Sequence, residues 1–244
     1  MARERKNHRG LFWALIGGAI LLAGLIAIFV NAALNQPEAD PTPSPTSTST
    51  EPPVTSPPAA GDDVVDPDVV DSGWVPEPIT TDPDLYIRRA LEAASTFDTQ
   101  RAGRDEWLTY LDTWFTPDIR YTSPTDQLDA MESAQRELRQ IVVLPEPEWD
   151  SLANEDGRVT AANAGDVAYV DVPEDDSGSM RIGTADVTLT FVRTSGDGSE
   201  HSYDETVRVS VQVLCGAGSV PTPDSSQQPG DCKVVRYFPE PMEP

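Results

Sequence analysis

Twenty consecutive residues near the N-terminus, Leu11 to Val30, contain neither a charged side chain nor a proline. A helix of this length rises about 30 Å, the thickness of a bilayer's hydrocarbon core. It satisfies its own backbone hydrogen bonds, as a membrane-spanning segment must. The ten preceding residues hold four basic side chains and one acidic one. The positive-inside rule therefore predicts a single-pass plasma-membrane protein with a cytoplasmic basic tail (1–10), a transmembrane helix (11–30) and an extracytoplasmic remainder.

A cleaved signal peptide is the alternative interpretation of the same segment. It has the same order of charge and apolar residues, and Val30-Asn31-Ala32 resembles a cleavage site. The apolar region of a signal peptide is usually only about 7–15 residues long. The longer run here favours an uncleaved anchor.

Residues 31–84 have the composition of a disordered, acidic linker rich in proline, serine and threonine. They hold twelve of the 23 prolines and eleven acidic residues, without a lysine or arginine. Such a stretch cannot bury enough apolar surface to offset the entropy of ordering it. We therefore expect a spacer that holds a folded domain away from the membrane. The acidic residues between Asp62 and Asp71 lack the order of a calcium loop, so no metal site is predicted there.

Charge and composition exclude two classes of function. After residue 30 the chain carries 13 basic and 40 acidic residues, and such a surface repels phosphate, so we expect no nucleic-acid partner. Two cysteines and two histidines are too few for a cysteine- or histidine-based metal centre. No phosphate-binding loop or dinucleotide fingerprint is present, so no cofactor is predicted.

Residues 85–240 are expected to fold as one domain, followed by a short tail at 241–244. Apolar residues at helical spacing predict amphipathic helices over 83–99, from about Arg104 to Pro117, and over Asp126–Ile141 with Leu128, Met131 and Leu138 inward. Period-two alternation then predicts the strands Arg158–Ala162, Asp166–Val172, Met180–Arg193, His201–Cys215 and Cys232–Phe238.

Helices followed by a run of antiparallel strands indicate an α+β domain with about three helices packed on a curved sheet. Asp197-Gly198 between two alternating segments predicts a tight hairpin. Cys215 ends one strand and Cys232 begins the next. In an exported chain we expect these two residues to form a disulfide that contributes about 3 kcal/mol in the chain-entropy model. A free-thiol role is the less favoured alternative.

This order of elements resembles the nuclear-transport-factor-two-like, or cone, fold. Ala93-x-x-x-Phe97, Glu106-Trp107-Leu108-x-x-Leu111 and Thr116-Pro117-Asp118-Ile119 are similar to a pattern in actinobacterial single-span proteins. In those proteins an extracytoplasmic cone domain follows one membrane helix, as in inner-membrane scaffold components of conjugative or type IV secretion systems. The last strand departs from the pattern because it lacks a Trp-x-Val ending, and the cysteine pair is an addition.

The resemblance implies a non-enzymatic scaffold or assembly component of a cell-envelope machine with protein partners. The alternatives are a surface module that binds a small apolar ligand in the cone cavity and, third, a cavity acid/base enzyme. We predict no catalytic residue. Carboxylate pairs such as Asp112/Asp118 and Glu132/Glu137 are expected on solvent faces. The side chains that an enzyme of this fold would draw on are Tyr110, Tyr169, Asp171, Asp186, His201 and Tyr203.

Overall fold

The computed structural model of the 244-residue chain describes residues 63–238 and 240–242. The expected basic tail, membrane helix and most of the expected linker lie outside these residues. Within the described part, no helix combines the length and apolar character that a membrane crossing needs.

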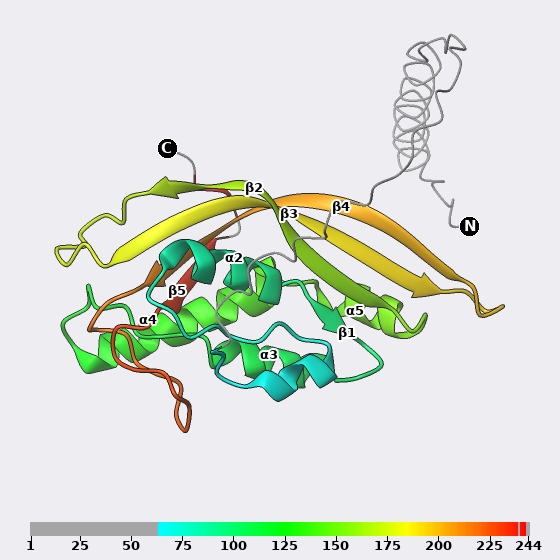
Figure 1. Cartoon of the computed structure of the whole chain (residues 1–244), viewed down its shortest axis with the longest axis horizontal. Coiled ribbons are helices and arrows are strands. Elements are labelled where there is room, and N and C mark those ends of the chain that lie inside the picture. The colour runs from blue at the N-terminus through cyan, green and yellow to red at the C-terminus, as the bar shows by residue number, and fades with distance from the viewer. Residues whose placement is uncertain (1–62, 239, 243–244) are drawn as a thin grey trace, which may run out of the picture. The chain divides into compact units, whose positions relative to one another are not determined.

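One curved antiparallel sheet forms one layer of the domain, and the helices pack against its concave side (Figure 1). The strand order is β1-β2-β3-β4-β5, so each strand pairs with its neighbours in sequence. The described part of the chain is therefore an α+β fold with a five-stranded sheet. The strands are β1 (Phe97–Asp98), β2 (Arg158–Val170), β3 (Met180–Thr194), β4 (Glu200–Leu214) and β5 (Lys233–Phe238).

Helix α2 (Pro83–Ala93) packs on β2, β3 and β4 at the centre of the concave face. Asp82 caps its N-terminus, accepting a hydrogen bond from the Asp84 backbone N–H at 2.9 Å, as the Asp-Pro pair predicts. The helix lies close to the sheet at Gly183, where an added Cβ would lie 2.7 Å from Ile87 Cδ1. A glycine at this position of β3 is what allows that approach.

The remaining helices complete the layer under the sheet. Trp149 of α5 stacks on Phe97 and on Trp107 of α3, and Trp107 is tilted against Phe97, so the three rings form an aromatic part of the core. These helices are α3 (Arg104–Asp112), α4 (Pro124–Glu137), the π-helical turn η2 (Leu138–Val142) and α5 (Glu146–Ala153). Helix α5 was not among the predicted helices, although Pro145, acidic residues in the first turn and apolar residues three apart are signals of a helix start. Leu128 was expected inward but is 52% exposed.

Strand β2 also differs from expectation, because it is one strand where two were predicted. Its register shifts between Ala164 and Ala168, and Gly165 has a φ of +78°. A glycine in this conformation forms a bulge within a continuous strand as readily as a turn between two strands. The hairpin predicted at Asp197-Gly198 is confirmed, with Thr194 opposite Glu200.

Residues 63–84 were assigned to the disordered linker, and this part of the prediction is wrong. The 3₁₀ turn η1 (Pro67–Ser72) is capped by Asp66, and Val65 N–H donates to Glu77 O at 2.9 Å. Trp74 stacks on Tyr110 with ring centroids 5.1 Å apart. The segment is ordered because its acidic residues cap helices or form specific contacts, while its apolar residues pack on the domain.

The C-terminal residues also pack on the sheet, beyond the boundary expected at residue 240. The Met242 backbone N–H donates to Ser210 Oγ at 2.8 Å, and Thr184 Oγ1 donates to Met242 O at 2.6 Å. Thr184 and Ser210 are buried and lie opposite each other on β3 and β4. The tail therefore supplies partners to two hydroxyl groups that the fold buries.

Candidate functional site

A groove of about 510 Å³ lies between the concave face of the sheet and the helical layer. Its walls are mostly apolar side chains of β3, β4, the end of α2 and the segment 141–145. Its apolar lining includes Leu189, Phe191, Val207, Val209, Ile141 and Phe238. The alternation of β3 and β4 directs these strand residues to the concave side, and Ile141 and Val142 at the end of η2 line the groove with them. The groove therefore lies where the end of η2 meets the sheet.

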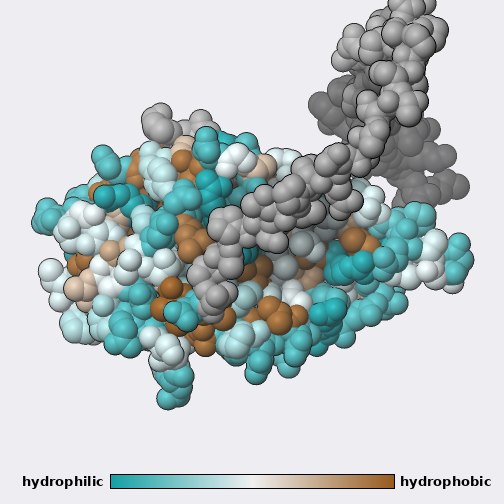
Figure 2. All heavy atoms as spheres, in the orientation of Figure 1, coloured by the Kyte–Doolittle hydropathy of each residue, from teal (hydrophilic) through white to brown (hydrophobic). Residues whose placement is uncertain are grey.

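Two charged residues of β4 also line the groove. Glu205 is exposed on the same side as the apolar residues, and Arg208 donates to Asp186 Oδ1 at 2.8 Å across the β3–β4 pair. The face shown in Figure 2 is mostly hydrophilic, with apolar side chains gathered in small patches. An apolar groove in such a surface is the kind of feature that binds a ligand or a partner protein.

Strand β4 has two segments that differ in their pairing. Ser210–Leu214, the closed segment, pairs with β3 on one side and β5 on the other. Glu200–Val209, the open segment, pairs with β3 alone among the described residues. The open segment borders the groove through Val207 and Val209.

A buried ion pair lies on the other side of the core, where the segment before α2 meets β5. Lys233 Nζ is 2.8 Å from Glu77 Oε1, and both side chains are essentially inaccessible to solvent. The ammonium group also donates to Thr113 O and Thr222 Oγ1, each at 2.7 Å. Every N–H of the ammonium therefore has an acceptor, as a buried charge requires.

The carboxylate of Glu77 is equally well satisfied. The Tyr86 hydroxyl donates to Oε1 at 2.5 Å and Gln227 Nε2 donates to the same oxygen at 3.2 Å. Burial, followed by the charge of Glu77, raises the pKa of Tyr86 well above its ordinary value. Burial lowers the pKa of Lys233, while Glu77 opposes that change. Because each group is enclosed and bonded, we interpret the cluster as a structural connection between the start of the domain and its last strand.

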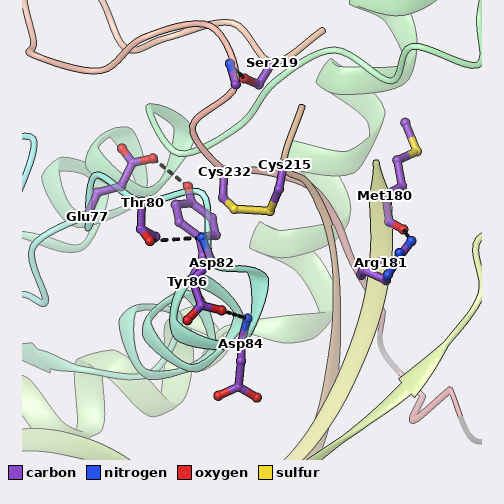
Figure 3. Close-up of a disulfide and its surroundings, with 11 residues drawn as sticks. Glu77, Thr80, Asp82, Asp84, Tyr86, Met180, Arg181, Cys215, Ser219 and Cys232 are labelled. Carbon is purple, nitrogen blue, oxygen red and sulfur yellow. Dashed lines mark hydrogen bonds between the residues drawn. A yellow bond between two sulfur atoms is a disulfide. The ribbon is translucent and has the colours of Figure 1, made fainter. Parts of the chain in front are cut away.

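The disulfide lies beside this cluster, as Figure 3 shows, with the Tyr86 hydroxyl directed at Glu77 nearby. Cys215 and Cys232 are bonded to each other, and the chain has no other cysteine. The bridge joins the end of β4 to the residue before β5, and Cys232 is fully buried. It thus closes the loop that carries Thr222 and Gln227.

The six side chains considered for acid/base chemistry are scattered over the described structure, and none lines the groove. Tyr110 donates to Val75 O at 2.7 Å, and Tyr169 donates to Asp84 Oδ1 at 2.7 Å. Asp171 and His201 are exposed. Asp186 is paired with Arg208, and Tyr203 stacks on Phe191 with centroids 5.0 Å apart.

The two carboxylate pairs are not uniformly on solvent faces, which corrects the expectation. Asp118 is only 6% exposed and accepts from Arg120, and Glu137 pairs with Arg236, whereas Glu132 is exposed. Asp112 is partly buried beside Arg139, and burial raises its pKa while Arg139 opposes the rise. Ion pairs with arginines account for the partial burial of these carboxylates. The spacing of the acidic residues along the sequence did not indicate where those arginines would lie. Among residues 63–238 and 240–242, no three His, Cys, Asp or Glu side chains are grouped as metal ligands.

Comparison with known proteins adds the following. No protein-family model and no curated protein matches the chain. Among solved structures it is similar to an IcmL-like type IV secretion system protein from Legionella pneumophila, with 12% identity over 64% of this chain and 88% of that one, and a TM-score of 0.38. It is also similar to CagV, a VirB8 homolog of the Helicobacter pylori type IV secretion system, with 14% identity over 55% and 78% of the chains and a TM-score of 0.30.

A periplasmic fragment of TraM is a third similar structure, with 9% identity over 62% of this chain and 89% of that one, and a TM-score of 0.31. All three are thus secretion-system or Tra proteins by name. At these scores the likeness carries no argument about the role of this chain.

Proposed function

We propose that the chain is a non-enzymatic, membrane-anchored scaffold component of a cell-envelope assembly. In this proposal Leu11–Val30 anchors the chain, the acidic stretch that follows acts as a tether, and the domain from residue 63 onward docks protein partners outside the membrane. The conjugative or secretion machinery indicated by the sequence resemblance is the proposed context.

The groove is the observation that carries this proposal. Its walls are apolar, and the titratable side chains considered for catalysis lie elsewhere. Chemistry by general acids and bases needs such groups within hydrogen-bond reach of the reacting atoms. Glu205 and Arg208 do line the groove, but Arg208 is held by Asp186. Apolar walls with few charges suit recognition of another molecule better than proton transfer.

Fractionation of cells that produce the full chain with a C-terminal epitope tests the topology. We expect the epitope in the membrane fraction and open to protease added to spheroplasts, and we expect deletion of residues 11–30 to release the chain from the membrane. Native gel electrophoresis of gently solubilised membranes should then place the chain in a large assembly. Recovery of the intact chain from the cytosol, or as a monomer from membranes, would contradict the proposal.

A second candidate function follows from the size of the groove. Its volume of about 510 Å³ lies within the range of about 300–1,000 Å³ that small-molecule sites occupy. Mass spectrometry of the natively purified chain separates the two candidates. A stoichiometric bound apolar molecule would favour a ligand-binding module, whereas an empty groove in a chain that purifies with envelope proteins favours the scaffold.

A further inference from the structure

The buried cluster around Glu77 brings an amine and a carboxamide together. Lys233 Nζ lies 3.5 Å from Gln227 Oε1, and the two residues are only 1% and 4% exposed. Glu77 Oε1 accepts a hydrogen bond from each of them, from Lys233 Nζ at 2.8 Å and from Gln227 Nε2 at 3.2 Å. A carboxylate oxygen therefore connects a lysine nitrogen with the amide nitrogen of a glutamine. A nucleophile, an electrophile and a group that carries protons are thus enclosed in one site.

The carboxamide of Gln227 is held in one orientation by hydrogen bonds at both ends. Thr222 N–H donates to its Oε1 at 2.8 Å, while its Nε2 donates to Glu77. A backbone N–H that donates to a carbonyl oxygen stabilises the negative charge that develops there when a nucleophile attacks the carbon. The carbon under attack is Cδ of Gln227, and its oxygen is the atom that lies 3.5 Å from Lys233 Nζ.

The surroundings of Lys233 favour its neutral form, which has the lone pair that an attack requires. Burial lowers the pKa of Lys233, while the charge of Glu77 opposes that change. A proton that moves from Nζ to Glu77 converts the ion pair into two neutral groups, and a buried site favours neutral groups. The nitrogen is also held in place, because it donates to Thr113 O and Thr222 Oγ1, each at 2.7 Å.

We propose that Lys233 and Gln227 form an isopeptide bond, an amide bond between two side chains, with Glu77 as the proton carrier. Glu77 takes one proton from the ammonium group of Lys233, and the lone pair of Nζ then attacks Cδ of Gln227. The bond between Nζ and Cδ forms and the bond between Cδ and Nε2 breaks. A second proton passes from Nζ to Nε2, so that ammonia leaves and a neutral Glu77 remains. The enclosed site keeps water away from the carbon, and no further reactant is needed.

The product closes the loop 216–231 a second time. The disulfide joins Cys215 and Cys232 on either side of the loop, whereas the isopeptide bond joins Gln227 within the loop to Lys233, the first residue of β5. Thiols cleave a disulfide but not an amide, so the isopeptide bond holds this part of the loop to β5 whether or not the cysteines are oxidised. The inference concerns the chain's own covalent structure and does not depend on the proposed scaffold function.

Mass spectrometry of the purified full chain tests the bond directly. After reduction and alkylation of the cysteines, trypsin releases peptide 209–233 from an unlinked chain, because it cleaves after Arg208 and Lys233. It does not cleave after a linked lysine, so the linked chain gives peptide 209–236, lighter by one ammonia than its sequence requires. We expect this lighter peptide, in an amount that grows as freshly refolded chain is incubated. Recovery of peptide 209–233 alone, or of 209–236 only at its full mass, would overturn the proposal.

Two adjacent glutamines provide a matched pair of variants. Gln227→Met replaces the carboxamide by an apolar side chain of similar length, and we expect it to abolish the loss of ammonia. Gln228 is exposed, and its Nε2 donates to Ser226 O at 3.3 Å, away from the lysine. Gln228→Met should therefore form the lighter peptide as fully as the parent chain. Equal yields from the two variants would contradict the assignment of Gln227 as the electrophile.

The role of Glu77 has its own test in Glu77→Gln, which keeps the size of the side chain and removes the proton acceptor. We expect the link to form at least about a hundredfold more slowly, as when a general acid/base is lost. The parent chain held unfolded in urea is the second control, because it keeps Glu77 but separates the three groups, and we expect no link there. A folded Glu77→Gln chain that links at the parent rate, or a link that forms in urea, would contradict the mechanism.

Discussion

The alternating valines of β4 run from the open segment into the closed segment, but their surroundings differ. Val211 and Val213 are fully buried, whereas Val207 and Val209 on the same face are half-buried beside the groove. The closed segment lies between two strands and next to the disulfide, and the strand beside it carries the buried ion pair. Among the described residues the open segment has β3 as its ladder partner, and its concave face borders the groove. The two ends of one strand therefore differ in how far the fold encloses them.

The largest effect that tests this difference is expected from the ion pair beside the closed segment. Lys233→Met leaves the Glu77 carboxylate buried without its partner, and we expect a loss of about 3–5 kcal/mol in the free energy of unfolding. Urea denaturation measures it. The double variant Glu77→Gln/Lys233→Met should be less destabilised than the single one, because no unpaired charge remains.

The matched control for that experiment is an ion pair that solvent reaches. Arg193 lies 3.0 Å from Glu155, and the two side chains are 29% and 45% exposed. Arg193→Met should cost at most about 1 kcal/mol. Similar losses from Lys233→Met and Arg193→Met would remove the proposed distinction between the two ends of the sheet.

The disulfide should give the next largest effect. Replacing Cys215 and Cys232 together by alanine removes a cross-link across a sequence separation of 17 residues, which the chain-entropy model values at about 3 kcal/mol. Denaturant unfolding of the double variant checks this value. Amide exchange in the open segment should stay as in the parent chain, since the bridge lies at the other end of β4. Faster exchange throughout β4 would show that its two segments are not independent.

Two valines on one face of β4 allow a direct comparison. Val211→Ala removes two methyl groups from a fully buried site, and about 2 kcal/mol is expected from lost burial and the cavity that remains. Val207→Ala should cost about 1 kcal/mol or less because its side chain already borders the groove. Equal losses in thermal or urea unfolding would mean that the groove is filled in solution.

The smallest effect concerns alkaline pH. Burial, followed by the charge of Glu77, raises the pKa of Tyr237 far above its ordinary value of 10.0. In the unfolded chain this hydroxyl ionises near pH 10, whereas in the folded chain it stays protonated. Above pH 10 the folded state therefore binds more protons than the unfolded state, and the free energy of unfolding falls as the pH rises. The pKa values of Tyr86 and Tyr110 are also raised, so these two hydroxyls change stability with pH in the same direction.

Tyr237→Phe should therefore make the fall in stability above pH 10 less steep. At neutral pH the variant loses one buried hydrogen bond to Ala90 O, at 2.8 Å, and about 1 kcal/mol of stability. Unfolding measured from pH 7 to pH 11 gives both values. An unchanged slope in the variant would contradict the sign worked out above.

The ion pair shows what local sequence cannot reveal. Glu77 is one of eleven acidic residues in a stretch of linker-like composition, and its partner lies 156 positions away. One signal was present, because Lys233 is one of only two lysines beside fifteen arginines. A lysine inside an apolar strand indicates a buried partner, but it does not say which acidic residue supplies it.

The sequence by itself determined the α+β class, the hairpin at Asp197-Gly198, most strand positions and the pairing expected of the two cysteines. These features follow from local propensity and from hydrophobic periodicity. The periodicity indicates which side of a strand is apolar. Only the tertiary structure decided that residues 63–84 join the fold and that the groove opens beside β4. The first depends on contacts such as Trp74 on Tyr110 and Glu77 on Lys233, and the second on how the helices meet the sheet. Both are set by contacts between residues distant in the chain.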